Sequence, residues 1–185
     1  MQRLPVVIVL AAGLGTRFRD AGGQQDKLLA PLTMAGGTRA VREHVIRAAR
    51  ASGLPWHVVE REHTRQLPGQ GMGWSIATGV AATAGAPGWL ILPADLPLVR
   101  PETLWQVACT LQEHEVVVPA VRGQRGHPVG FSAACAAELL ALQGDRGARQ
   151  VIERHAAFTL ELDDLGCILD VDTPEALAQA QQHAG

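Results

Sequence analysis

A hydrophobic run near the N-terminus leads into a glycine turn that is followed by two cationic side chains. The run covers residues 6–10, the turn contains Gly13 and Gly15, and Arg17 and Lys27 come after it. Glycines after a strand let backbone N–H groups approach an anion, because no Cβ stands in the way. Arginine and lysine supply the positive charge that a triphosphate needs. The segment therefore predicts a phosphate-binding loop that takes a nucleotide.

The spacing of these residues excludes two common phosphate-binding motifs. A dinucleotide fingerprint, G-x-G-x-x-G, would need a third glycine where Phe18 stands. A P-loop, G-x-x-x-x-G-K-S/T, would need a glycine where Asp26 precedes Lys27. A plain glycine-rich strand–turn–helix connection is the remaining alternative. We favour the nucleotide loop over it because Thr16, Arg17 and Lys27 follow in order.

An aspartate follows a second hydrophobic run, in the segment WLILPADLP. Asp95 would lie at the carboxyl edge of a sheet, which is where open α/β folds bind ligands. Beside a triphosphate, its carboxylate would hold Mg²⁺, a hard cation that takes oxygen ligands. The alternative is an Asx turn before Pro97. Together with the glycine loop, the sequence favours the metal role.

The segment LDVDTPEAL contains a second acidic position. Asp172 could hold the same ion opposite Asp95, or it could form a helix capping box with Glu175, and Thr173 is a competing cap. We favour the metal role for Asp172. Asp170 is a second-choice ligand on the same face of the chain.

Two further segments combine glycines with charged residues. RGQRGHPVGF could be a surface hairpin turned at Gly123 or an ordinary solvated charge cluster. It could also be a mobile lip that offers Arg122, Arg125 and His127 to an anionic acceptor. GDRGAR is expected to begin a helix with Asp145 as its cap, and its N–H groups could also bind phosphate.

The segment GMGWSIATG predicts another helix N-terminus near the first loop. Its Ser75 could face the nucleotide. The segment does not support serine hydrolase chemistry, because residues 73–77 lack the final glycine of a G-x-S-x-G elbow.

Composition favours a cytoplasmic globular protein without nucleic-acid or membrane partners. The 185 residues are 47% hydrophobic, 18% charged and 4% aromatic, with a net charge of −2. This length fits one domain, 1–185, and neither the charge nor the aromatic content indicates nucleic-acid or membrane binding. Three separated cysteines without a C-x-x-C pair indicate reduced thiols, and we find no signal peptide or bilayer-spanning stretch.

Hydrophobic runs alternate with helical patterns along most of the chain. The runs are continuous, which is typical of parallel strands that helices cover on both faces. The alternation predicts an α/β fold with a doubly wound, mostly parallel sheet. The expected strands are 6–10, 56–60, 89–92, 115–119, 128–131 and, more weakly, 158–162, and the expected helices are 40–51, 72–84, 101–113, 133–142, 147–155 and 174–183.

The chain resembles the molybdenum cofactor nucleotidyltransferases over almost its full length, and within them the cytidylyltransferase branch. The segments LAAGLGTRF, DKLLAPL, GMGWSIATG, PADLPLV, GQRGHPVGF, GDRGAR and DVDTPEAL occur in the family's order. The resemblance implies a Rossmann-like three-layer α/β/α sandwich of the nucleotide-diphospho-sugar transferase type. It also implies transfer of CMP from CTP to the terminal phosphate of molybdopterin, with Mg²⁺ as cofactor and a molybdenum hydroxylase as a possible client.

The resemblance also assigns roles to individual positions. It gives catalysis to Arg17, Lys27 and Asp95, and metal binding to Asp95 and Asp172. The implied nucleotide-binding residues, within and beyond the loop 11–15, are Leu10, Ala11, Ala12, Gly13, Gly15, Thr16, Gly71, Ser75 and Gly79. The implied acceptor-binding residues are Arg125, Gly126, His127 and Pro128.

The chain departs from the family pattern at several points. The loop between Phe18 and Lys27 looks longer, Trp74 replaces a small residue, and the segment after Glu60 looks shortened. Ala12 stands where guanylyl-transferring relatives tend to have glycine, and its methyl group would narrow the base pocket. We therefore expect CTP to be preferred over GTP.

Two alternatives to this function remain. A sugar- or polyol-phosphate nucleotidyltransferase shares the same opening loop. A catalytically silent protein that hands cofactor to a partner enzyme would bind nucleotide without releasing pyrophosphate.

Overall fold

Strands that run in one direction form most of a seven-stranded sheet. In the computed structural model, which describes residues 3–13, 15–69 and 71–184, β1, β4, β5, β6 and β9 share one direction, and β7 and β8 oppose it. The strand order is β4 (Trp56–Val59), β1 (Val6–Leu10), β5 (Gly88–Pro93), β8 (Val129–Ser132), β6 (Val116–Val121) and β7 (Gln124–Arg125), with β9 (Phe158–Glu161) paired to β6.

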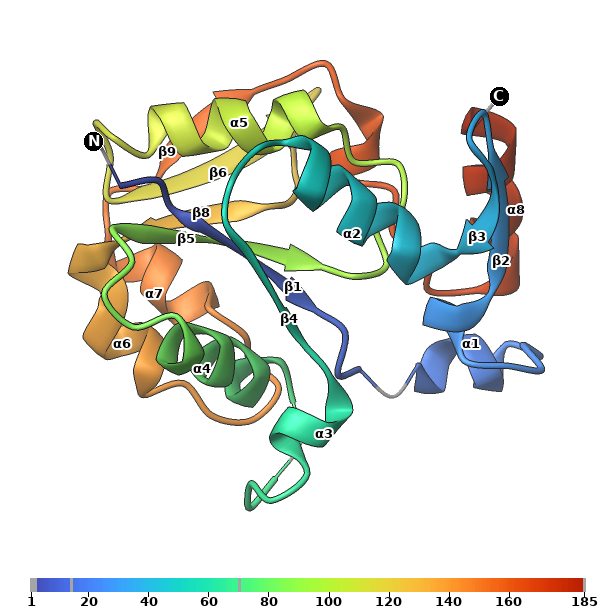
Figure 1. The fold of residues 1–185 in the computed structure, drawn as a ribbon, viewed down its shortest axis with the longest axis horizontal. Helices are drawn as coiled ribbons and strands as arrows, with labels where there is room; N and C mark the ends of the chain where they lie inside the picture. The colour runs from blue at the N-terminus through green and yellow to red at the C-terminus, as the bar shows by residue number, and fades with distance from the viewer. Residues whose placement is uncertain (1–2, 14, 70, 185) are drawn as a thin grey trace.

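Helices cover both faces of this sheet (Figure 1). The helices α2 (Val41–Ala51) and α5 (Pro101–Thr110) pack on one face, and α4 (Met72–Ala82), α6 (Ala136–Leu140) and α7 (Arg149–Arg154) pack on the other. Strand β1 serves both cores, since Val7 and Val9 belong to the first and Ile8 to the second, all fully buried. The expected three-layer α/β/α sandwich with a mostly parallel sheet is confirmed.

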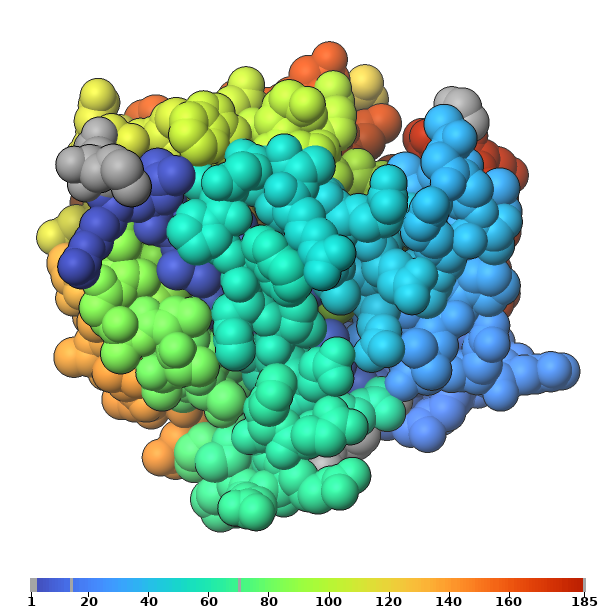
Figure 2. All heavy atoms as spheres, viewed as in Figure 1, coloured from blue at the N-terminus to red at the C-terminus, as the bar shows by residue number. Residues whose placement is uncertain are grey.

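A third, smaller core lies beside the sheet and was not expected from the sequence. It lies among α1 (Thr16–Asp20), the hairpin β2 (Pro31–Met34) and β3 (Gly37–Ala40), and α8 (Pro174–His183). The side chain of Gln181 bonds both the backbone N–H and the carbonyl of Thr33, at 2.9 and 2.7 Å, and so joins α8 to the hairpin. Figure 2 shows the light-blue hairpin beside the teal α2 on the face turned to the viewer.

The expected elements all occur. Strand β1 and helix α8 have the predicted bounds, and the ends of the others lie within three residues of the predicted ones. The expected helix 133–142 is a short 3₁₀ turn, η2 (Ala133–Cys135), followed by α6. The remaining short elements are α3 (Arg61–Thr64), η1 (Lys27–Leu29) and η3 (Leu165–Cys167). Among the described residues, no helix is long and apolar enough to cross a membrane.

Gly79, expected to bind nucleotide, lies instead in the core between α4 and the sheet. A Cβ at this position would lie 2.6 Å from Cγ2 of Ile8 and 3.0 Å from Cγ2 of Val59. Both distances are too short for two carbon atoms. The glycine therefore lets the helix approach β1 and β4 closely, which corrects the sequence-based assignment.

We predict that Gly79→Ala lowers the free energy of unfolding by about 1–3 kcal/mol, because overpacking a closed core has that cost. Helix propensity alone would make the alanine variant more stable by about 1 kcal/mol. Chemical denaturation measures the difference, with Ala81→Ser on the exposed side of the same helix as the control. A more stable Gly79→Ala variant would contradict the packing role.

Candidate active site

A cavity of about 800 Å³ opens at the carboxyl ends of β1 and β5. The loop after β1, the residues after β5, the N-terminus of α4, strand β7 and the segment after η3 all contribute to its wall. The residues predicted for the site that line it are Leu10, Ala12, Gly13, Gly15, Thr16, Arg17, Lys27, Gly71, Ser75, Asp95, Arg125, Gly126, His127 and Asp172.

The remaining predicted positions lie elsewhere. Ala11 is buried and Pro128 lies beyond the lining residues, as does Gly79. Leu14, inside the loop 11–15, lies outside the described residues. The fold therefore brings most of the predicted residues to one cavity, although they come from distant parts of the chain.

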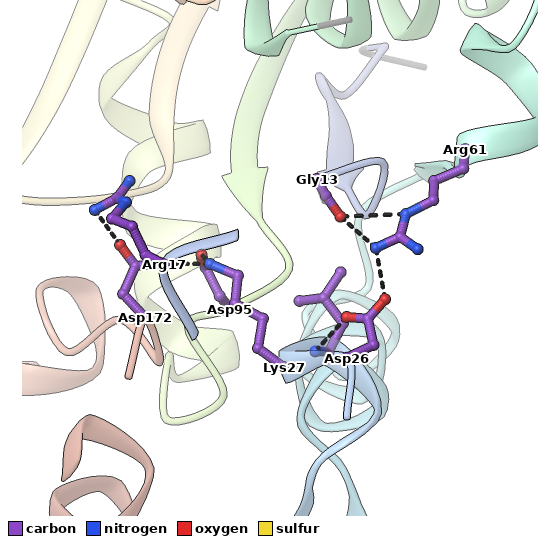
Figure 3. Close-up of polar contacts among 8 residues, drawn as sticks. Gly13, Arg17, Asp26, Lys27, Arg61, Asp95 and Asp172 are labelled. Carbon is purple, nitrogen blue, oxygen red and sulfur yellow. Dashed lines mark hydrogen bonds and ion pairs between the residues drawn. The ribbon is translucent and has the colours of Figure 1, made fainter. Parts of the chain in front are cut away.

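The centre of the site is a buried ammonium group between two carboxylates (Figure 3). Nζ of Lys27 donates to Oδ2 of Asp95 at 2.6 Å and to Oδ1 of Asp172. The side chains of Lys27, Asp95 and Asp172 are only 11%, 17% and 16% exposed. Arg17, whose side chain is 80% exposed, pairs with the other oxygen of Asp172. Positive and negative charges thus alternate across the cavity floor.

Burial and charge pairing act in opposite directions on these groups. Burial lowers the pKa of Lys27, but the carboxylates of Asp95 and Asp172 outweigh it and raise the pKa above its usual value. Burial raises the pKa of Asp172, and Lys27 together with Arg17 outweighs it, so that the pKa is lowered. Lys27 is therefore charged at neutral pH and Asp172 is ionised.

Asp170 lines the same cavity, where the charge of Lys27 has a smaller effect on it than burial has. Burial and the negative charges of Asp172 and Asp95 raise the pKa of its carboxyl group. The pKa of Asp170 is thus shifted in the opposite direction to that of Asp172.

Lys27 reaches the cavity despite the longer loop that precedes it. It is the first residue of η1, which Asp26 caps by accepting a hydrogen bond from the N–H of Leu28 at 3.0 Å. Gly15 has a left-handed φ of 62° at the start of α1, and a Cβ there would lie 3.4 Å from Cγ of Lys27. The left-handed backbone favours glycine at this position, and the lysine stem packs against it.

Arg61, on α3, is a residue of this region that the sequence analysis missed. Its Nε and Nη2 donate to the carbonyl oxygen of Gly13 at 3.2 and 2.6 Å, and Nη2 also donates to Asp26 at 2.5 Å. The sequence pointed to the neighbourhood of Arg61 only through the shortened segment after Glu60.

The structure excludes the capping alternative for Asp172. Thr173 is the N-cap of α8 and accepts a hydrogen bond from the N–H of Ala176 at 3.1 Å, so Asp172 is not the cap. The side chain of Asp95 bonds Lys27, and its backbone carbonyl accepts from the N–H of Val171 at 2.8 Å. This backbone bond holds the two acidic segments side by side.

On the acceptor side, the hairpin interpretation is confirmed, and the segment also lines the cavity. The turn between β6 and β7 contains Arg122 and Gly123 at φ 53° and 78°. Arg125, Gly126 and His127 then follow the cavity wall. A cationic side chain and a histidine are thus available to an anionic acceptor.

Two features of this wall depend on its packing. A Cβ on Gly126 would lie 2.5 Å from the carbonyl oxygen of Cys167, so a glycine is needed there. His127 is partly buried, and its buried Nδ1 has no hydrogen-bond partner among the described residues. Burial lowers the pKa of His127, which keeps the imidazole neutral near pH 7.

The expected cap role of Asp145 is wrong, because α7 begins at Arg149 with Ala148 as its N-cap. Asp145 lines the cavity beside Gly71, where a Cβ on Gly71 would lie 2.5 Å from its Oδ1. The turn is held there by a hydrogen bond from the N–H of Gly73 to the carbonyl of Gly144, at 2.8 Å. Within the described part of the chain, the Asp145 carboxylate has no hydrogen bond or ion pair.

The donor set fits a divalent cation that a nucleotide brings with it. Asp95 and Asp172 contact one lysine nitrogen, so their hard oxygen atoms converge. Across residues 3–13, 15–69 and 71–184, no group of three or more His, Cys, Asp or Glu side chains is arranged to hold a metal. Mg²⁺ often uses one or two carboxylates and takes its remaining ligands from phosphates and water. The two aspartates match that pattern.

Comparisons with known proteins agree with this geometry. The family model for the MobA-like NTP transferase domain matches residues 7–158. The purine catabolism protein PucB of Bacillus subtilis (strain 168) is 32% identical over 133 residues, which are 66% of this chain and 64% of PucB. The matched region thus spans less than two thirds of that relative's length.

Solved structures share the fold at lower identity. Rv0371c from Mycobacterium tuberculosis H37Rv has a TM-score of 0.76 at 24% identity, over 97% of this chain and 98% of that one. Its complex with manganese has a TM-score of 0.74 at 23% identity, over 98% and 100%. The molybdopterin-guanine dinucleotide biosynthesis protein A of Archaeoglobus fulgidus has a TM-score of 0.67 at 18% identity, over 96% and 97%.

The family model covers most of the chain, including the glycine loop, Lys27, Asp95 and the β6–β7 hairpin. These are elements that the structure brings to the cavity. This protein belongs to the MobA-like NTP transferase domain family.

Proposed function

We propose that this protein transfers CMP from CTP to the terminal phosphate of molybdopterin and releases pyrophosphate. The observation that carries the proposal is the buried Lys27 ammonium, which shares one cavity with the glycine loop and two acidic side chains. The order of the sequence motifs supports molybdopterin as the acceptor. The likeness to an archaeal protein named for molybdopterin-guanine dinucleotide biosynthesis agrees with that class of acceptor.

The proposed reaction needs no dedicated general base. The attacking phosphate of the acceptor is already anionic. Its oxygen forms a bond to the α-phosphorus of CTP while the bond from that phosphorus to the bridging oxygen of pyrophosphate breaks. Positioning and charge neutralisation supply the catalysis in such transfers. Lys27, Arg17 and the N–H groups of the glycine loop take the charge of the leaving pyrophosphate.

Asp95 and Asp172 would hold Mg²⁺ in this proposal. The bound dication neutralises charge on phosphate oxygens. The manganese complex of a protein with the same fold supports a divalent metal in general. The Lys27 ammonium group, which lies between the two aspartates, would contact the phosphates beside the cation.

Ala12 and Asp145 support CTP as the donor. Both line the cavity, Ala12 in the loop after β1 and Asp145 beside the N-terminus of α4. The methyl group of Ala12 narrows the space for a purine. A carboxylate accepts hydrogen bonds only, so Asp145 suits the amino group of cytosine and opposes the carbonyl oxygen that uracil has there.

Arg125 and His127 would contact the molybdopterin end of the complex. Arg125 is exposed on β7 and offers positive charge to the acceptor phosphate. The neutral, partly buried His127 also lines this wall. In this proposal, residues 1–185 act as one domain in the cytoplasm, and a molybdenum hydroxylase takes up the product.

We predict that Lys27→Ala lowers turnover about a hundred- to a thousandfold, since one charged donor to the transition state contributes roughly 2.7–4 kcal/mol. Pyrophosphate release measures the loss, and thermal unfolding checks the fold. Arg19→Ala, on the exposed side of α1, is the control and should retain its turnover. Pyrophosphate release near the normal rate by Lys27→Ala would remove this lysine from the catalytic site.

We predict that Asp95→Asn abolishes the metal-dependent activity and that Asp172→Asn raises the Mg²⁺ concentration required. An amide is a poorer ligand than a carboxylate for a hard dication. Initial rates over a Mg²⁺ titration test both variants, with the exposed Asp163→Asn as control. If Asp172→Asn lowers only the melting temperature, with unchanged turnover per folded molecule, its role is structural.

We predict that CTP is used at least tenfold faster than GTP and UTP, because single pocket contacts discriminate by about 1–3 kcal/mol. In Asp145→Asn, the preference for CTP over UTP should fall, and Asp20→Asn is the exposed control. The assay gives molybdopterin equal concentrations of CTP, GTP, ATP and UTP and measures which nucleotide is incorporated. Faster incorporation of GMP than of CMP would contradict the choice of base.

A further inference from the structure

Arg61 contacts both ends of segment 13–26, which runs from the glycine loop to the residue before Lys27. Its guanidinium group extends from α3, after β4, to the loop after β1 (Figure 3). It donates two hydrogen bonds to the carbonyl oxygen of Gly13, where the loop begins, and one to the carboxylate of Asp26, where the loop ends. One side chain thus connects the two ends of segment 13–26 to the edge of the sheet.

Asp26 links Arg61 to the turn that carries Lys27. One oxygen of Asp26 accepts from Arg61 and the other accepts from the N–H of Leu28, which begins the 3₁₀ turn η1. Lys27 is the first residue of that turn. Hydrogen bonds between charged groups are shorter and stronger than neutral ones, so this series of contacts constrains the lysine backbone.

Arg61 does not itself line the cavity, as the wall of α3 is formed by Thr64. Its side chain is 43% exposed, and exposed ion pairs add little to global stability. Helix α3 has its own capping box, in which the N–H of Glu60 donates to Nδ1 of His63 at 3.0 Å. Helix α3 therefore does not depend on Arg61 for its stability.

From these contacts we propose that Arg61 is a positioning residue. It clamps the two ends of segment 13–26 and thereby holds the side chain of Lys27 in its position in the cavity. The inference rests on the proposed nucleotidyl transfer. Arg61 acts through Lys27, with no contact to the reacting atoms.

The first test measures the clamp without any substrate. Amide hydrogen exchange across residues 13–29 is compared for wild type, Arg61→Ala and Arg65→Ala. Arg65 is an exposed arginine one turn later, and its side chain has no hydrogen bond or ion pair among the described residues. Exchange at Leu28 and its neighbours should be several-fold faster in Arg61→Ala alone. Equal exchange in all three proteins would overturn the clamp.

The second test separates positioning from substrate binding by a double-mutant cycle with Lys27→Ala. In the wild-type background, Arg61→Ala should lower kcat/KM by about 10- to 100-fold, because small displacements of a catalytic group have effects of that size. In the Lys27→Ala background, the same change should have less than about a threefold effect. Equal losses in both backgrounds would mean that Arg61 acts independently of Lys27, which overturns the proposal.

The hydrogen-exchange test does not depend on the proposed function. If the wild-type protein releases no pyrophosphate from any nucleoside triphosphate with molybdopterin, the proposed reaction is wrong. The exchange comparison then still decides whether Arg61 holds the loop. Thermal unfolding of each variant confirms that a change in exchange is local to the loop.

Discussion

The pairing of the Lys27 ammonium with the carboxylates of Asp95 and Asp172 is the interaction on which the site depends. Its three members come from η1, from the end of β5 and from the segment before α8. A charge buried without a partner destabilises a protein strongly, so these segments must lie together. The backbone bond from Val171 to Asp95 holds the C-terminal segment against the sheet edge.

Close backbone approaches determine the shape of the cavity around this pairing. Gly71 and Gly126 lie against chain segments that a Cβ would displace, and both line the cavity. The small core beneath the β2–β3 hairpin, which includes Phe18 and Val171, anchors the phosphate loop and the acidic segment together. The reactive groups are therefore held by the sheet edge and by packed elements, which is what precise positioning requires.

The sequence predicted the layered fold and most of the lining residues, because strand burial and motif order are local signals. It missed the β2–β3 hairpin, whose short strands are largely exposed. Gly79 has the appearance of a nucleotide-loop glycine, and only its distance to Ile8 shows that it serves packing. Arg61 bonds a carbonyl 48 positions away, and such a contact leaves no pattern in the sequence.

The identity of the acceptor tests the account most directly. Wild-type protein is incubated with CTP, Mg²⁺ and equal amounts of molybdopterin, a sugar 1-phosphate and a polyol phosphate, and the products are identified by mass spectrometry. The account predicts a CMP adduct of molybdopterin with one pyrophosphate released for each adduct. CMP found on a sugar or polyol phosphate would contradict it, as would bound CTP without any adduct.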